Sequence, residues 1–278
     1  MTAPPQFTFD AASLGQFRPP TLQQASNLQA LFKSGKVAVG TALSYPSRHV
    51  AKTLAVTGAD WCWVDAEHSG GKMIPVVRVP SKTAFDYMAW CLDAGAGGII
   101  IPHLETVEEM KAVIAACRFP PIGHRSFPPF IFIPGVTDTT PEGETVFSLA
   151  NKHVGLIPQI ESRLGIQNME EIMKLEEVSA FMIGTGDLRL DMGLSLGIEG
   201  DEPEYVAAIQ KATRVSKQRG SPIVGGGMGV EMLKKRMDEG YRFIVCCADL
   251  HTLAYGTIKS VGEARAAAEE YMKGIHGN

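Results

Sequence analysis

Two carboxylates that follow apolar, strand-like runs carry the clearest chemistry in this sequence. Glu161 ends the run HVGLIPQIES, and Asp187 ends the run SAFMIGTGDL. Carboxylate oxygens are hard ligands of the kind Mg²⁺ prefers, and two at neighbouring strand ends leave coordination positions for water and substrate. Gln159 faces the same side of its strand as Glu161, while Gly184 and Gly186 would let a ligand approach the backbone near Asp187. We expect a metal site here; the alternative is that each carboxylate caps a helix or pairs with a surface cation.

Arg78 ends another apolar run, IPVVRVP. A buried guanidinium needs an anionic partner, because an isolated buried charge is costly. A substrate carboxylate or a developing enolate would meet that need, and Arg78 is therefore a candidate for substrate binding. The alternative is a structural ion pair with an acid at a neighbouring strand end.

Histidines follow two further runs. In WCWVDAEH, Asp65 and Glu67 lie close to His68, and a carboxylate beside an imidazole can hold it for proton transfer, directly or through water. The residues leave open which carboxylate pairs with His68, and a histidine at a strand end is also commonly structural. His103, in GGIIIPHLE, would either face the same site or contact a partner subunit.

The elements that must position these residues are eight short apolar runs alternating with amphipathic helical segments. Continuous hydrophobicity indicates strands covered on both faces, as in a parallel sheet. The polar candidates follow most of the runs instead of gathering at one switch point, which favours an α/β protein of the (β/α)8 TIM barrel type over a doubly wound sheet. We assign residues 1–30 to an N-terminal extension and residues 31–278 to a single barrel domain. The runs are VAVGTALS (37–44), WCWVDAEH (61–68), IPVVRVP (74–80), GGIIIPHLE (97–105), HVGLIPQIES (153–162), SAFMIGTGDL (179–188), SPIVGGGMG (221–229) and RFIVCCADL (242–250).

Two connections depart from a regular barrel. Between His68 and Ile74 only residues 69–73 remain, whereas two parallel strands are usually joined by a dozen or more residues. The crossover between the second and third strands is therefore missing or shortened. Residues 120–145 form a long segment rich in proline and glycine, and long loops of this kind often cover active sites. Within it, Arg125 would either fix the loop to a carboxylate or reach a substrate.

The glycine-rich sequence GGGMG (225–229) ends the seventh run. Its spacing matches neither a P-loop nor a dinucleotide-binding fingerprint. A tight turn is the simplest interpretation, and a close backbone approach to a substrate carboxylate is the functional alternative.

Composition excludes several classes of function. The 278 residues include 26 basic and 30 acidic residues, for a formal charge of −4, so the chain lacks the basic surface of a nucleic-acid or acidic-membrane binder. The N-terminus has no secretory pattern, and no apolar stretch approaches the ~18 residues of a membrane span. The five cysteines lack the spacings of a zinc site or a disulfide framework. We expect a cytoplasmic protein.

Six motifs in order resemble the HpcH/HpaI aldolase and citrate lyase family, whose members are metal-dependent barrels of the phosphoenolpyruvate/pyruvate type that act on 2-oxo acids. The resemblance runs from about residue 30 to about residue 260. The IPH sequence and the RSFPPF loop are most similar to the macrophomate synthase group of this family. The motifs are WVDAEH, VVRVP, LDAGAGGIIIPHLET, FPPIGHRSF, LIPQIES and IGTGDLRLDMGL.

This resemblance implies roles for individual residues. Glu161 and Asp187 would hold a divalent metal, Mg²⁺ in the first place, with Mn²⁺ and Co²⁺ as alternatives. Arg78 would bind the 2-oxo acid and steady the enolate oxygen. His68, supported by Asp65, would transfer protons, and His103 would lie near the active site. The substrate would also contact Gln159, Gly184, Thr185 and Gly186.

The function that follows is a metal-dependent carbon–carbon lyase acting on a 2-oxo acid through a Mg-bound pyruvate enolate, by oxaloacetate decarboxylation or aldol chemistry. One alternative is a 4-hydroxy-2-oxo acid aldolase, a class II pyruvate aldolase. An alternative of another class is a non-catalytic barrel that binds 2-oxo acids, which the short 69–73 connection suggests. The resemblance also implies a homo-oligomer, a trimer or a hexamer, because the family commonly builds these assemblies.

Overall fold

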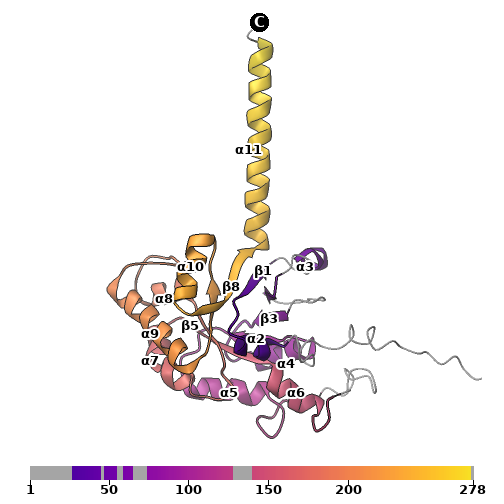
Figure 1. Ribbon diagram of the computed structural model, residues 1–278, viewed down its shortest axis with the longest axis vertical. Helices are drawn as coiled ribbons and strands as arrows, with labels where there is room; N and C mark the ends of the chain where they lie inside the picture. Colours follow the sequence, from indigo (N-terminus) through magenta and orange to yellow (C-terminus); the bar gives the residue numbers. More distant parts are fainter. Residues whose placement is uncertain (1–26, 45–46, 55–58, 65–73, 128–139, 277–278) are drawn as a thin grey trace, which may run out of the picture.

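Eight parallel strands close into a barrel in chain order, β1 to β8 (Figure 1). The computed structural model describes residues 27–44, 47–54, 59–64, 74–127 and 140–276. The prediction of a (β/α)8 barrel is confirmed. The strands are β1 (Ala38–Leu43), β2 (Trp61–Val64), β3 (Ile74–Arg78), β4 (Gly98–Ile101), β5 (Gly155–Ile160), β6 (Phe181–Ile183), β7 (Ile223–Gly226) and β8 (Tyr241–Ala248).

Side chains alternate between the interior of the barrel and its outer face, as strand geometry requires. Val76 and Ile157 belong to a buried cluster inside the barrel. Val77 and Leu156 belong to a second cluster, in which the strands pack against the surrounding helices. The strands are therefore buried on both faces, which explains why their sequences are continuously apolar.

Local sequence signals fix where several helices begin and end. Thr106 and Thr145 form capping boxes with the third helical residues, Glu109 and Ser148. Gly220 ends α9 in the left-handed conformation, at φ 65°. The helices are α2 (Leu28–Lys33), α3 (Arg48–Leu54), α4 (Phe85–Asp93), α5 (Val107–Cys117), α6 (Val146–His153), α7 (Arg163–Ile172), α8 (Thr185–Asp191), α9 (Pro203–Arg219), α10 (Val230–Asp238) and α11 (Asp249–His276).

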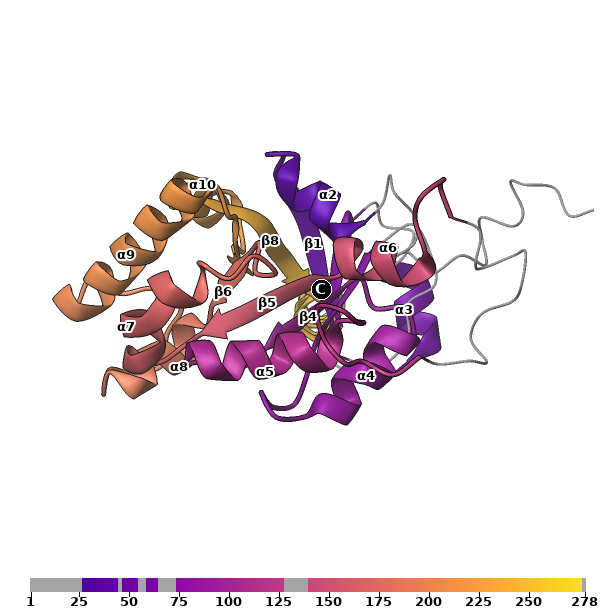
Figure 2. The same ribbon diagram turned by 90° about the horizontal axis from the view of Figure 1, so that it is seen from below.

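Helix α2 packs into the N-terminal end of the barrel, beside α6, as the view from below shows (Figure 2). Leu28 is fully buried and Phe32 is 5 % exposed, and both belong to the interior cluster. The ring of Phe32 meets that of Phe243 on β8 edge to face, with 4.4 Å between centroids. Helix α2 crosses the predicted boundary at residue 31, and the division into extension and barrel stays a prediction.

The connection between β2 and β3 falls within residues 65–73, which lie outside the described residues. The two strands nevertheless pair in parallel, from Trp61 opposite Ile74 to Val64 opposite Val77. Every other consecutive pair of strands is joined through at least one helix. The barrel is therefore closed between β2 and β3, although only nine residues separate Val64 from Ile74 in the sequence.

The described part of the long segment, residues 120–127 and 140–145, lies at the N-terminal end of the barrel. Arg125 pairs there with Asp93, and its guanidinium lies 4.5 Å from the ring centroid of Phe119. Of the two interpretations of Arg125, the structure supports the one in which it fixes the loop to a carboxylate.

Helix α11 projects away from the barrel beyond β8 (Figure 1). Leu253, Tyr255, Ile258 and Tyr271 on this helix are between 59 % and 71 % exposed. Across the described part of the chain, no helix is both long enough and apolar enough to span a bilayer.

Candidate functional site

The predicted site residues that the structure describes come from consecutive strands and lie at their C-terminal ends. Arg78 ends β3, and His103 follows β4. Gln159 lies near the end of β5, and Glu161 follows that strand. Asp187 lies in the first turn of α8, after β6. In a (β/α)8 barrel this end carries the catalytic groups. Asp65, Glu67 and His68 lie outside the described residues, so their roles stay predictions.

Alternation along the strands explains why these side chains meet. Ile157 faces the barrel interior, so Gln159 and Glu161, two and four residues later, face the same side. On β3, Val76 faces the interior and Arg78 follows on the same face. Successive interior positions thus change from apolar to polar as each strand reaches the open end.

Glu161 is a buried carboxylate held on both oxygens. It is 3 % exposed. Its Oε1 accepts a hydrogen bond of 2.7 Å from the backbone N–H of His103, and its Oε2 accepts one from Nε2 of Gln159. His103 has φ 53°, in the left-handed region that is uncommon for residues other than glycine. In this conformation the backbone N–H of His103 points at Glu161, and the His103 side chain is about half exposed.

Gly184 makes room for this arrangement. A Cβ atom at Gly184 would overlap Oε2 of Glu161 and lie 2.8 Å from Nε2 of Gln159. Gly186 is less constrained, because the nearest atom to a Cβ there is Cδ1 of Leu196 at 3.5 Å. Of the two glycines, Gly184 is therefore required for the position of the carboxylate, and Gly186 and Thr185 form the following half-buried turn.

Burial raises the pKa of Glu161, and the negative charge of Asp187 raises it further. The hydrogen bonds from His103 and Gln159 oppose this effect. The two carboxylates that were predicted to share a site are therefore close enough to repel each other. A cation between them would relieve that repulsion.

The residues present fit a divalent metal. Both candidate ligands are carboxylates, the donors that Mg²⁺ and Mn²⁺ prefer. Oε1 of Gln159 is buried and has no hydrogen-bond partner among the described residues. This oxygen can therefore accept a hydrogen bond from a water molecule in the site. Within the described ranges no group of three or more His, Cys, Asp or Glu residues could hold a metal. Glu161 and Asp187 would therefore bind it together with water and substrate.

Arg78 is half-buried, and its guanidinium lies 5.0 Å from the ring centroid of Trp63 on β2. This cation–π contact positions the guanidinium at the open end of the barrel. Trp63 was not among the residues predicted from the sequence. The signal for it is the alternation in WCWV, which places Trp63 on the interior face two residues after Trp61.

A charged network beside His103 was also missed. Lys82 pairs with Glu105 at 3.0 Å and with Glu109 at 2.7 Å, and Ser162 donates a hydrogen bond to Glu105. Nε2 of His103 lies 3.9 Å from Glu105, while its Nδ1 lies 3.9 Å from Glu161. The imidazole is thus flanked by carboxylates on both sides. Spacing could not reveal this, because the network joins the ends of three strands.

The glycine-rich sequence, which begins in β7 and ends before α10, has a packing role. A Cβ at Gly225 would lie 2.6 Å from the ring of Tyr241, and Gly229 precedes α10 at φ 82°. These contacts support the interpretation of a tight turn.

Fold and site together define a class of protein: a (β/α)8 barrel enzyme with a carboxylate pair and an arginine at the C-terminal ends of its strands. The family model for HpcH/HpaI aldolase/citrate lyase matches residues 71–255. The chain belongs to this family and is a carbon–carbon lyase of the aldolase type, so the non-catalytic alternative loses its support.

Relatives of known name agree with this assignment. Over 240 residues the chain is 30 % identical to a 4-hydroxy-2-oxo-heptane-1,7-dioate aldolase of Klebsiella pneumoniae, covering 81 % of this chain and 88 % of the relative. It is also 30 % identical to a 5-keto-4-deoxy-D-glucarate aldolase of Salmonella arizonae, covering 81 % and 91 %. Among solved structures, macrophomate synthase is 35 % identical with a TM-score of 0.81, covering 88 % of this chain and 91 % of that one. The predicted resemblance to the macrophomate synthase group is confirmed.

Proposed function

We propose that this lyase cleaves a carbon–carbon bond of a 2-oxo acid, with oxaloacetate decarboxylation as the specific reaction. The observation that carries the proposal is the buried Glu161 carboxylate, held by His103 and Gln159 beside the charge of Asp187 at the open end of the barrel. Membership of the HpcH/HpaI aldolase/citrate lyase family supports the cleavage of a carbon–carbon bond.

We propose Mg²⁺ as the metal, with Mn²⁺ and Co²⁺ as alternatives, and Glu161 and Asp187 as its ligands from the protein. When bound, the cation supplies Lewis acidity that polarises the keto group of the substrate. Gln159 holds one ligand oxygen in place, and its own unpartnered Oε1 accepts a hydrogen bond from a water molecule in the site.

Arg78 binds the substrate carboxylate next to the keto group and stabilises the oxygen that becomes negative. In oxaloacetate the bond between C3 and C4 breaks, carbon dioxide leaves, and the electron pair forms the enolate of pyruvate. A proton added at C3 completes pyruvate. Trp63 keeps the Arg78 guanidinium in position through this change of charge.

Retro-aldol cleavage of a 4-hydroxy-2-oxo acid is the second candidate, and the two aldolases that are 30 % identical support it. This reaction forms the same enolate but must first remove a hydroxyl proton. We propose His68, oriented by Asp65, as that base. Pyruvate release from a 4-hydroxy-2-oxo acid should then fall in His68→Ala, while oxaloacetate decarboxylation should change little.

We also propose that the chain forms a homo-oligomer through α11. This helix of 28 residues makes its contacts with the barrel through β1 and β8, and its apolar side chains, such as Leu253 and Ile258, are exposed. A helix with so little packing gains little stability on its own. A second copy of the chain would cover the apolar residues. Ile258→Glu should therefore reduce the mass measured by light scattering without unfolding the barrel.

We further propose a cytoplasmic location, which the free state of all five cysteines supports.

The decisive experiment is pyruvate formation from oxaloacetate by purified protein, with Mg²⁺ and with EDTA, against the rate given by Mg²⁺ alone. Glu161→Ala and Asp187→Ala should abolish turnover, whereas Asp238→Asn, at an exposed acid that ends α10, should keep it. Turnover that survives EDTA, or that survives both alanine substitutions, would overturn the proposed site.

A further inference from the structure

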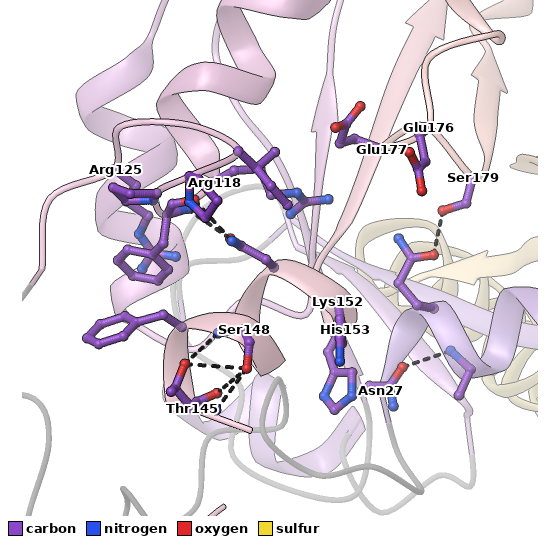
Figure 3. A pocket seen from close by; sticks show the side chains of 18 of the residues that line it. Asn27, Arg118, Arg125, Thr145, Ser148, Lys152, His153, Glu176, Glu177 and Ser179 are labelled. Atoms are coloured by element: carbon purple, nitrogen blue, oxygen red, sulfur yellow. Dashed lines mark hydrogen bonds between the residues drawn. The ribbon is translucent and has the colours of Figure 1, made fainter. Parts of the chain in front are cut away.

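A cavity lies at the N-terminal end of the barrel, opposite the carboxylate site. It has a volume of about 1260 Å³ and is lined from α2, α6, the segment that follows α5 and the loop that precedes β6 (Figure 3). None of the residues placed in the lyase site lines it. Its charged groups therefore need an explanation of their own.

Arg118 provides a buried cation in this cavity. It is 2 % exposed, and its Nη2 donates a hydrogen bond of 3.0 Å to the carbonyl oxygen of Val154. Its Nη1 is buried without a hydrogen-bond partner among the described residues. Burial lowers the pKa of Arg118 to about 10, so the guanidinium stays charged at neutral pH. A buried charged donor without an acceptor is costly, which indicates that an acceptor from outside the fold belongs here.

Two glutamates stand on the opposite wall (Figure 3). Glu177 is half-buried and Glu176 is exposed. The charge of Glu177 acts on Arg118, yet the described residues contain no ion pair between the two. Arg118 is held by the carbonyl oxygen of Val154, so the cavity has a positive side chain and a negative side chain in different parts of its lining.

An aromatic wall forms another part of the cavity lining. The ring of Phe147 meets those of Phe119 and Phe127 edge to face, with centroid distances of 5.0 Å and 5.4 Å. Phe127 and Ile122 are 49 % and 48 % exposed and line the cavity. This wall would cover an apolar group of the size of an aromatic ring.

We propose that the cavity binds a free α-amino acid with an aromatic or large apolar side chain. Its carboxylate accepts from Nη1 of Arg118, its ammonium group faces Glu177, and its side chain packs on Phe127 and Phe147. A zwitterion pairs with both Arg118 and Glu177, whereas a simple anion pairs with Arg118 alone and a simple cation pairs with Glu177 alone. The site is independent of the proposed lyase reaction.

The test is calorimetric titration of the full chain with L-phenylalanine, 3-phenylpropionate and 2-phenylethylamine. The two analogues lack the ammonium and the carboxylate, respectively. The titrations are done in EDTA and in the Arg78→Ala background, so that the carboxylate site cannot contribute. We expect L-phenylalanine to bind at least about tenfold more tightly than either analogue, because each analogue loses a charge-assisted hydrogen bond.

Variants assign each preference to one wall. Glu177→Gln should remove the preference for L-phenylalanine over 3-phenylpropionate and should not weaken the binding of 3-phenylpropionate. Arg118→Gln should remove the preference over 2-phenylethylamine. Glu170→Gln, at an exposed glutamate of α7 outside the cavity, is the matched control and should change neither. If Arg118→Gln does not fold, Ile122→Asn at the exposed rim should weaken all three ligands.

Three results would overturn the proposal. One is no saturable binding of L-phenylalanine up to about 10 mM. Another is equal affinity for the amino acid and both analogues. The third is binding that is present in the unsubstituted chain but lost in the Arg78→Ala background, which would place the ligand in the carboxylate site.

Discussion

Alanine in place of Gly184 is the sharpest test of the carboxylate site. The backbone there, at φ −82° and ψ 81°, accepts alanine, so the effect of the substitution is steric. The new Cβ would overlap Oε2 of Glu161 and lie 2.8 Å from Cβ of the same residue. Because the carboxylate is held on both oxygens, it cannot move aside without losing a hydrogen bond from His103 or Gln159.

The size of the effect follows from these contacts. A hydrogen bond to a charged group contributes about 1.5–3 kcal/mol, and crowding a packed site costs about 1–3 kcal/mol. We expect Gly184→Ala to lower the free energy of unfolding by about 1–3 kcal/mol. Displacing the Glu161 carboxylate, the proposed metal ligand, should weaken metal binding by about 10–100-fold, as disturbing the support of a metal ligand typically does.

The assay is pyruvate formation from oxaloacetate as a function of Mg²⁺ concentration, with thermal unfolding measured in EDTA. Gly256→Ala is the control, because a Cβ at this position of α11 would meet no atom within 4 Å among the described residues. If Gly184→Ala shows the Mg²⁺ dependence of the unsubstituted chain, the position of Glu161 does not govern metal binding, and the reasoning is wrong.

Three further predictions follow from the same site and from the helix caps. Because burial and Asp187 raise the pKa of Glu161, protons compete with the metal at a higher pH than at an ordinary glutamate. The Mg²⁺ concentration for half-maximal activity should therefore rise as the pH falls from about 8 to about 5; a constant value would contradict this. Arg78→Lys should raise KM for oxaloacetate by about 10–100-fold, and Trp63→Leu by about 2–5-fold, in steady-state kinetics. Thr106→Ala should lower the unfolding free energy by about 1 kcal/mol in urea titrations, because α5 loses its capping box; an unchanged midpoint would refute that role.

The sequence was most informative where one physical requirement controlled many residues. Strands buried on both faces must be apolar throughout, so all eight could be located from their composition. The change from apolar to polar at strand ends also indicated Gln159, Glu161 and Asp187, because a barrel brings strand ends together.

Features that depend on contacts across the fold were not predictable. The left-handed backbone of His103 has no local signal such as glycine or asparagine. The pairing of Lys82 with Glu105 joins residues after different strands, and charge spacing along the chain does not show it. Helix α11 was also missed, because Gly256 and Gly262 lower its helix propensity and its apolar residues lack a partner within the barrel.

The packing of α2 determines by which route substrate enters the barrel and products leave it. Leu28 and Phe32 fill its N-terminal end, and the interior below Gln159 is packed with residues such as Ile157 and Met182. Substrate and products must therefore use the same opening, at the C-terminal ends of the strands. A molecule of pyruvate that has not departed blocks the arrival of the next oxaloacetate, so pyruvate should inhibit competitively.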